Sequence, residues 1–216
     1  ASGGPFFNFE KKLMKNINKK MALKHPRWKM GKKISIDSAT MMNKIFEVIE
    51  AFRLFDLKLD QINIVIHPQS IVHALVNYKN GTSHALMHNT DMKIPIYSGM
   101  TEKYVKQKSI VSEFNINKYE NMNFYKINVS KFPSLNILKN ISEKCTLFDT
   151  VLISANDELV DLFLKDKIKF NDIILYLKRI INLKIFNKYK YIKPKNFKEI
   201  QDLNRTVRLK TRSICI

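Results

Sequence analysis

The sequence is poor in cysteine and glycine and has no long apolar run, and each shortage excludes a class of protein. Two cysteines, Cys145 and Cys215, are too few for a disulfide framework, and no CxxC pair is present, so a reduced compartment is the default. The five glycines form no GxGxxG fingerprint, and P-loop and GxSxG motifs are also missing. No apolar run approaches the roughly 18 residues of a membrane span, which excludes an integral membrane protein.

Positive charge is abundant instead. There are 38 lysines and arginines against 19 acidic residues, giving a formal net charge of +19, which raises the hypothesis of a nucleic-acid-binding domain. Only six of these residues are arginine, the usual bidentate reader of bases and phosphates, and the lysines are spread among many Asn and Ile. Because AT-rich codons favour Lys, Asn and Ile, we favour a compositional bias and keep nucleic-acid binding as an alternative.

Three segments are expected from the pattern along the chain, and the apolar content of 45% is ample for a packed core. Residues 1–100 carry all the short motifs and are expected to form a catalytic domain, and residues 101–131 have no sustained period and are expected to form a linker. Residues 132–216 show helical periodicity and are expected to form a C-terminal helical bundle. The helices are expected to begin at Pro133 and to span 147–164, 172–185 and 197–209.

The first segment is expected to combine one helix with a small mixed sheet, which makes its fold class α/β (α+β). An amphipathic helix is predicted from Ser38 to Phe55, with Asp37 or Ser38 as its cap. The β-branched run 61–66 predicts a strand that stops before Pro68. Residues 71–78 and 82–88 flank Asn80-Gly81, which predicts a hairpin.

The predicted helix start near Ser38 suits an anion. Free backbone N–H groups and the positive end of the helix dipole would face outward there, beside the side chains of Ser38, Thr40, Asn43 and Lys44. Glu47 lies four residues after Asn43, on the same helix face, where a carboxylate could ligate a divalent metal. An ordinary capped surface helix with a Lys–Glu pair is the alternative interpretation.

Three other features have both a functional and a structural interpretation. Residues 2–5 (Ser-Gly-Gly-Pro) form either a backbone approach to a ligand or a plain loop. Residues 25–31 hold the only Trp, Trp28, and suit either a lid that excludes water or a hydrophobic anchor. His67 follows the predicted strand and is either a site residue or a satisfied structural histidine.

The hairpin raises a rival hypothesis of a zinc-binding module. A two-residue turn at Asn80-Gly81 would pair His73 with His88 and place His84 on the same face, and three imidazoles can hold zinc. A solvated polar face is the other interpretation of these histidines.

Taken together, the motifs resemble the 1-deoxy-D-xylulose 5-phosphate reductoisomerase family. The similarity is close over about residues 1–100, thin over 101–131 and modest afterwards. The matching residues are Ala1-Ser-Gly-Gly-Pro-Phe6, His25-Pro-Arg-Trp-Lys-Met-Gly31, Lys33-Ile-Ser-Ile-Asp-Ser-Ala-Thr-Met-Met-Asn-Lys44 with Glu47, Asp60-Gln61, Val65-Ile-His-Pro-Gln-Ser-Ile-Val-His73, Asn80-Gly81, Asp91-Met92 with Pro95, Phe132-Pro-Ser-Leu135 and Ala155-Asn-Asp-Glu-Leu159.

The resemblance implies a role for each matching site residue. It implies that Glu47 is one of three acidic ligands of Mg²⁺ or Mn²⁺, and that His67 is an active-site histidine of open role. It implies a closing loop around Trp28 and Met30, and cofactor contacts from Met30, Gly31 and Met92. The substrate phosphate and hydroxyls are implied to contact Ser2, His25, Ser38, Asn43 and Lys44.

The resemblance also implies the reaction and the partners. The family converts 1-deoxy-D-xylulose 5-phosphate into 2-C-methyl-D-erythritol 4-phosphate, with NADPH as reductant and a divalent metal, in the non-mevalonate isoprenoid pathway. A homodimer is implied, and no nucleic acid or membrane partner is expected. The family's NADPH-binding domain and its other two metal ligands would precede Ala1, so we expect a fragment or processed piece that is inactive without that upstream segment. The codon bias suggests a plastid of the apicoplast type, with a bacterial cytoplasm as the alternative.

Overall fold

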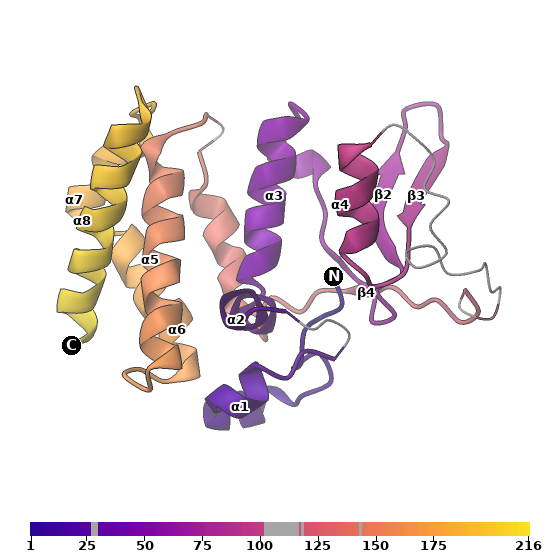
Figure 1. Ribbon diagram of the computed structural model, residues 1–216, viewed down its shortest axis with the longest axis horizontal. Helices are drawn as coiled ribbons and strands as arrows, with labels where there is room; N and C mark the ends of the chain where they lie inside the picture. The colour runs from indigo at the N-terminus through magenta and orange to yellow at the C-terminus, as the bar shows by residue number, and fades with distance from the viewer. Residues whose placement is uncertain (27–29, 102–116, 118, 143) are drawn as a thin grey trace. The chain divides into compact units, whose positions relative to one another are not determined.

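The computed structural model describes residues 1–26, 30–101, 117, 119–142 and 144–216 (Figure 1). The chain divides into two compact units. The first, here called the hairpin unit, comprises residues 1–3, 26–29 and 64–127. The second, here called the helical unit, comprises residues 4–25, 30–63 and 128–216.

Helix α5 is the centre of the helical unit. It spans Leu147–Leu164, as the sequence predicts, and its apolar residues recur at three-to-four spacing. Leu152, Ala155 and Leu159 are fully buried. The helix packs against α8 on one side and α6 on another (Figure 1). Lys165 is its C-cap residue, and the helix cannot continue beyond it because Asp166 has the left-handed conformation (φ 58°).

Helices α2, α6, α7, α8 and η5 of this unit contact α5. The prediction for 172–185 is corrected, because this stretch is divided at Asn182 into two helices, and the last predicted helix extends beyond residue 209. Pro133 begins a 3₁₀ helix rather than an α-helix. The elements are η1 (Lys11–Asn16), α1 (Lys19–Ala22), α2 (Lys32–Thr40), α3 (Met42–Leu54), η2 (Leu59–Gln61), η4 (Pro133–Asn140), α6 (Phe170–Ile181), α7 (Lys184–Asn187), η5 (Lys188–Lys190) and α8 (Phe197–Cys215).

The helix predicted from Ser38 to Phe55 is wrong at its start. Ser38 lies in the last turn of α2, and a new helix, α3, begins at Met42. Met41 between them is left-handed (φ 64°), so the helical path breaks there. The hydroxyl of Thr40 accepts a bond from the Met42 N–H (3.4 Å), and the Thr40 carbonyl accepts one from Ser134 (2.6 Å). These contacts satisfy backbone groups that the break exposes.

The described residues of the hairpin unit form two small antiparallel sheets and one helix. Strand β1 (Val65–Ile66) pairs with β4 (Tyr125–Lys126), and β2 (Val72–Asn77) pairs with β3 (Ser83–Met87). Helix α4 spans Lys93–Met100. The strand predicted over 61–66 is therefore only two residues long. The fold class, small sheets followed by a C-terminal helical region, is confirmed, and the pairing in both sheets is antiparallel where a mixed sheet was expected.

The hairpin turn is longer than the predicted two residues. Tyr78 N–H donates to the Thr82 carbonyl (2.9 Å) and Gly81 N–H to the Tyr78 carbonyl (3.0 Å). Gly81 has φ 86°, a conformation that favours glycine. The register is displaced by one residue from the prediction, so Val76 lies opposite His84. Further from the turn, the pairing has an irregularity between Val72 and Ala74.

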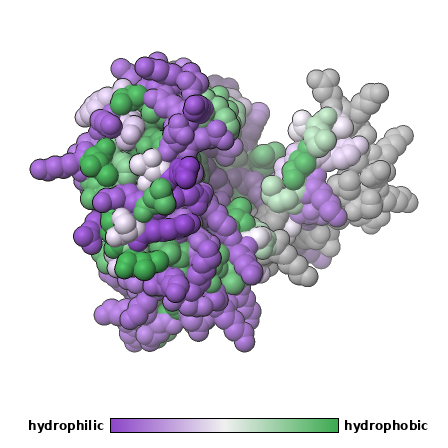
Figure 2. All heavy atoms as spheres, turned by 60° about the vertical axis from the view of Figure 1, so that its left-hand side comes forward, coloured by the Kyte–Doolittle hydropathy of each residue, from purple (hydrophilic) through white to green (hydrophobic). Residues whose placement is uncertain are grey.

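Hydrophilic residues cover most of the face of the helical unit that Figure 2 brings forward. The hydrophobic residues on this face lie in small separate groups, which is ordinary for a protein surface. Among the helices of the described residues, none combines the length and the apolar character needed to cross a lipid bilayer.

Candidate functional site

The start of α3 gathers the polar side chains that the sequence singled out. Asn43 and Lys44 occupy its first turn, where backbone N–H groups and the helix dipole favour an anion. The helix start that the sequence predicted near Ser38 therefore lies at Met42. Ser38 lies near the end of α2, only a few residues before α3 begins. It is therefore close in sequence to the first turn of α3 although it belongs to another helix.

Glu47 lies one turn further along α3. The Asn43 amide donates to Glu47 Oε1 (2.5 Å), and the Lys44 ammonium pairs with Oε2. The Glu47 side chain remains 46% exposed and that of Lys44 is 24% exposed. An amide and a cation thus fix an accessible carboxylate beside a helix N-terminus. This arrangement can hold an anion through Asn43 and Lys44 and offers one oxygen ligand to a hard divalent cation.

The glycine turn packs against the same segment. Gly4 has φ 64°, and a Cβ atom built there would lie 2.7 Å from the Ser38 carbonyl oxygen. Only glycine therefore fits without displacing backbone. The backbone that approaches Gly4 is the end of α2, so this contact does not test the interpretation of residues 2–5 as an approach to a ligand.

His67 is held firmly within the hairpin unit. It is 2% exposed, its Nδ1 lies 3.0 Å from the Asn123 carbonyl, and its ring stacks on Phe124 with centroids 4.7 Å apart. Its Nε2 is buried and has no hydrogen-bond partner within the described part of the chain. The residue thus has one nitrogen in a structural hydrogen bond and one without a partner among the described residues.

Ser2 and Met92 also lie in the hairpin unit. Ala1, directly before Ser2, is held at β1 by two bonds: its amino group donates to the Val65 carbonyl (2.7 Å), and the N–H of His67 donates to the Ala1 carbonyl (2.6 Å). Met92 precedes α4 and is 54% exposed. An exposed thioether at a helix start can contact a planar ligand.

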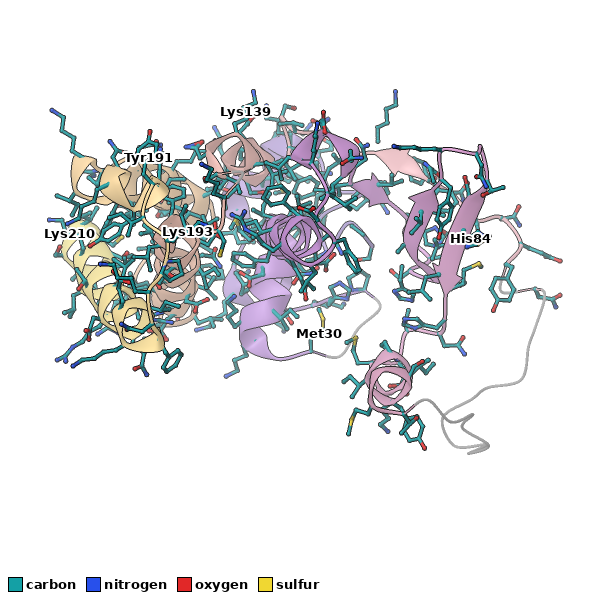
Figure 3. All side chains as sticks on the ribbon, turned by 90° about the horizontal axis from the view of Figure 1, so that it is seen from above. Met30, His84, Lys139, Tyr191, Lys193 and Lys210 are labelled. Carbon is teal, nitrogen blue, oxygen red and sulfur yellow. The ribbon has the colours of Figure 1, made fainter. Side chains whose placement is uncertain are left out.

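His25, Met30 and Gly31 lie at the two ends of the predicted lid, in the helical unit. Burial lowers the pKa of the half-buried His25, so its imidazole is neutral near pH 7. Met30, labelled in Figure 3, comes just before α2, and Gly31 is the residue at the helix start. Trp28 lies outside the described residues.

The histidines of the hairpin do not form the zinc site of the rival hypothesis. His73 and His88 do lie side by side, with rings stacked at 3.6 Å, and His73 Nε2 lies 3.1 Å from the His88 carbonyl. His84, on β3 in Figure 3, packs instead against Tyr78. Within the described ranges, no three His, Cys, Asp or Glu side chains are grouped so that they could hold a metal.

A buried polar cluster behind α2 was missed by sequence reasoning. Asp37 is 1% exposed and accepts a bond from Asn156 of α5 (2.8 Å), which is fully buried. Lys33 pairs with both Asp37 (2.5 Å) and Asp157 (3.0 Å). The available signal was the run Asn156-Asp157-Glu158 inside an otherwise apolar helix pattern, which is unusual unless the polar groups are paired.

Comparisons with known proteins agree on one family. The model of the 1-deoxy-D-xylulose 5-phosphate reductoisomerase C-terminal domain matches residues 1–55, and that of the DXP reductoisomerase C-terminal domain matches residues 87–210. Relatives of the same name from Pelagibacter ubique and Persephonella marina are 51% and 42% identical, over 100% and 93% of this chain and 55% and 52% of their own lengths.

Solved structures give the same result. A DOX-P reductoisomerase in complex with NADPH, fosmidomycin and magnesium is 34% identical with a TM-score of 0.91, and the match covers 100% of this chain and 53% of that one. The enzyme from Zymomonas mobilis in complex with NADPH is 30% identical with a TM-score of 0.84, over 100% and 54%. The chain thus spans about half the length of the relatives it matches.

Proposed function

Because this chain belongs to the 1-deoxy-D-xylulose 5-phosphate reductoisomerase family, we propose that it supplies the phosphate-binding half and one metal ligand of an enzyme that converts 1-deoxy-D-xylulose 5-phosphate into 2-C-methyl-D-erythritol 4-phosphate. The observation that carries the proposal is the grouping of Asn43, Lys44 and Glu47 at the start of α3.

Each predicted site residue keeps a role in this proposal. Asn43 and Lys44 bind the phosphate and hydroxyl groups of the sugar, because an amide, an ammonium and a helix N-terminus together favour a doubly charged anion. Ser38, Ser2 and His25 add polar contacts. His67 offers its uncommitted Nε2 to a proton transfer or to an orienting hydrogen bond. Residues 25–31, with Trp28 and Met30, form the lid.

Two cofactors belong to the proposal, and the donors present fit them. Glu47 is an exposed carboxylate that Asn43 orients, so it suits one position around Mg²⁺ or Mn²⁺ once Lys44 turns towards the phosphate. Gly31, Met30 and Met92 are the residues that would contact NADPH. When bound, the metal polarises the substrate ketone and its neighbouring hydroxyl, and NADPH supplies the hydride. The solved relatives hold magnesium and NADPH, which supports this assignment.

Complete activity requires more than these residues. One carboxylate is too few for a metal site, and the described residues contain no group of three or more His, Cys, Asp and Glu side chains that could hold a metal ion. We propose that the part of the relatives that this chain does not span binds NADPH and provides the other two ligands. Residues 1–100 keep the proposed catalytic role, 101–131 that of the linker and 132–216 that of the C-terminal helical domain. These segments are not the compact units of the fold, because residues 4–25 and 30–63 belong to the same unit as 128–216.

Assembly and compartment follow the family. We propose a homodimer, which is supported by the exposed apolar side chains of the hairpin unit, among them Leu75, Leu86 and Ile96. The relatives named above are bacterial proteins, so a bacterial cytoplasm is favoured over the plastid that the codon bias suggested.

Substitution of Glu47 in the full-length enzyme tests the metal assignment. Glu47→Gln should lower metal-dependent turnover by at least about 100-fold, because the amide keeps the shape but loses the charge that a divalent cation requires. The matched control is Glu50→Gln, an exposed carboxylate on the same helix. Steady-state NADPH oxidation over a range of Mg²⁺ concentrations provides the measurement, and undiminished activity in Glu47→Gln would remove the assignment.

Substitution of Asn43 and Lys44 tests the phosphate assignment. Lys44→Ala should raise KM for the sugar phosphate roughly 10- to 100-fold, because it removes a charge-assisted hydrogen bond worth about 1.5–3 kcal/mol. Asn43→Ala should weaken binding less. Lys58→Ala, an exposed lysine outside α3, is the control. Equal KM values in Lys44→Ala and this control would contradict the phosphate site.

A further inference from the structure

Ion pairs connect three helices of the helical unit behind the candidate site. Arg208 of α8 contacts Asp157 of α5 (Nη2 to Oδ2, 2.9 Å), and Lys33 of α2 contacts the other oxygen of the same carboxylate (Nζ to Oδ1, 3.0 Å). Lys33 also contacts Asp37 of its own helix (2.5 Å). One carboxylate on α5 therefore bridges a cation from α8 and a cation from α2, and Figure 1 shows α5 beside α8.

A buried hydrogen bond also joins α2 and α5. Asn156, the residue before Asp157, donates from Nδ2 to Asp37 Oδ1 (2.8 Å), and both side chains are almost completely buried. Burial raises the pKa of Asp37, and this effect outweighs the opposing effects of Lys33 and Asn156. A carboxylate is thus kept in the interior at an energetic cost. Apolar residues of similar volume would often be at least as stabilising, so stability alone does not account for this cluster.

The geometry of α2 bears directly on the candidate site. Asp37 directly precedes Ser38. Helix α2 ends at Thr40, the helix is interrupted at Met41, and α3 begins at Met42. Gly4 packs so closely on the end of α2 that a Cβ atom there would lie 2.7 Å from the Ser38 carbonyl oxygen. A rotation or shift of α2 therefore changes the distance between Ser38 and the first turn of α3.

Helix α3 is also connected to α5 by a charged side chain. Arg53, in its last turn, contacts Asp149 in the first turn of α5 (3.0 Å) and the carbonyl groups of Ser142 (3.0 Å) and Lys144 (2.8 Å). Both helices that carry the proposed phosphate ligands are thus tied to α5 by charged side chains. Hydrogen bonds of fixed geometry define a single arrangement more strictly than apolar packing does.

We propose that Lys33, Asp37, Asn156, Asp157 and Arg208 are positioning residues, which use the bundle formed by α5 and α8 to fix the α2–α3 junction in the geometry that binds the substrate phosphate. The proposal rests on the proposed function and goes beyond it, because it assigns to the C-terminal helices a direct effect on substrate affinity. None of these five side chains needs to touch substrate for this role.

Two partly exposed members of the cluster make suitable test sites, since their removal leaves the apolar core intact. Lys33→Met and Arg208→Met are compared in the full-length enzyme with Lys32→Met and Arg205→Met, which change exposed neighbours on the same helices. We expect KM for the sugar phosphate to rise about tenfold in both test variants, as found for coupling networks of this kind. KM for NADPH and both control variants should stay within about twofold of wild type. Lys33→Arg, which keeps the charge, should restore the KM.

Hydrogen exchange measured on the same variants provides a readout that does not depend on turnover. Backbone amides of residues 38–44 should exchange faster in Lys33→Met and Arg208→Met than in the controls, while those of α6 should not change. Lower thermal stability with unchanged KM and unchanged exchange at 38–44 would show a merely structural cluster and overturn the proposal. If wild type does not turn over the sugar phosphate, the proposed function fails, and the exchange data still decide whether the cluster fixes the junction.

Discussion

Helix α5 and the hairpin strands β2 and β3 are both rich in apolar residues, yet they bury them to very different extents. Leu152 and Leu159 of α5 are fully buried, whereas Leu75 of β2 and Leu86 of β3 are 49% and 60% exposed. The helix is covered on several sides by α2, α6 and α8. The hairpin is a two-stranded sheet, and two strands alone cannot bury both of their faces.

The two units are therefore stabilised by different interactions. The helical unit has an apolar core of its own, and its buried charged groups lie inside that core, so its stability and its site geometry are linked. The hairpin unit relies more on backbone hydrogen bonds and on local contacts, such as the stacked rings of His73 and His88. Substitutions in the two units should therefore differ in size even when the chemical change is the same.

The largest contrast is expected from truncating matched leucines. Leu159→Ala should lower the free energy of unfolding by about 3–4 kcal/mol, because it removes a fully buried side chain and leaves a cavity. In the monomer, Leu86→Ala should change it by less than about 0.5 kcal/mol, since the side chain is mostly solvated there. Urea denaturation followed by circular dichroism compares the two. Similar losses in both variants would show that the hairpin is as well packed as the helices.

The next contrast is the loss of stability when two glycines with positive φ, Gly4 and Gly81, are replaced by alanine. Gly4→Ala should cost about 2–3 kcal/mol, because it combines an unfavourable φ of 64° with a Cβ placed 2.7 Å from the Ser38 carbonyl oxygen. Gly81→Ala has a similar φ of 86° but open space around the new methyl group, so only the backbone strain of about 1 kcal/mol remains. Thermal unfolding of both variants measures the difference. A larger loss at Gly81 would argue against the close approach of Gly4 to α2.

The smallest effect is expected in the pH dependence of stability. Because the pKa of buried Asp37 is raised in the folded state, its contribution is fully present below its unfolded value, near 3.8, and is lost as the pH rises through the folded pKa. Asp37→Asn cannot ionise, so its stability relative to wild type should improve over that interval. Urea midpoints measured from pH 4 to pH 7 for both proteins supply the comparison. A constant difference across this range would contradict the raised pKa.

Local patterns predicted the parts of the fold that depend on local interactions. The helix over 147–164 was found with its predicted bounds, because its apolar spacing and its packing agree. The strand over 61–66 was too long, because β1 exists only where β4, sixty residues away, offers backbone partners. Likewise, the break between α2 and α3 depends on Met41 and on Ser134, which contacts Thr40 from 94 residues away. No local pattern contains these contacts.

The candidate site shows the same division. The spacing of Asn43, Lys44 and Glu47 placed them on one helix face, and the structure joins them by a hydrogen bond and an ion pair. The position of Ser38 relative to that face was wrong in the sequence reading, because it was assigned to the wrong helix. The cluster around Asp37 was not found at all, since a carboxylate and its partner Asn156 are 119 residues apart.

The amino-acid sequence by itself determined the family, through short motifs in a characteristic order, and the helix periodicity of the second half, through the spacing of apolar residues. Tertiary structure alone decided where the helix that offers its amino end begins, which histidines meet, and how a carboxylate in α2 is tied to α5 and α8. Helix periodicity is a property of neighbouring residues, whereas the end of a helix and the pairing of a buried charge depend on partners that only the folded chain brings close.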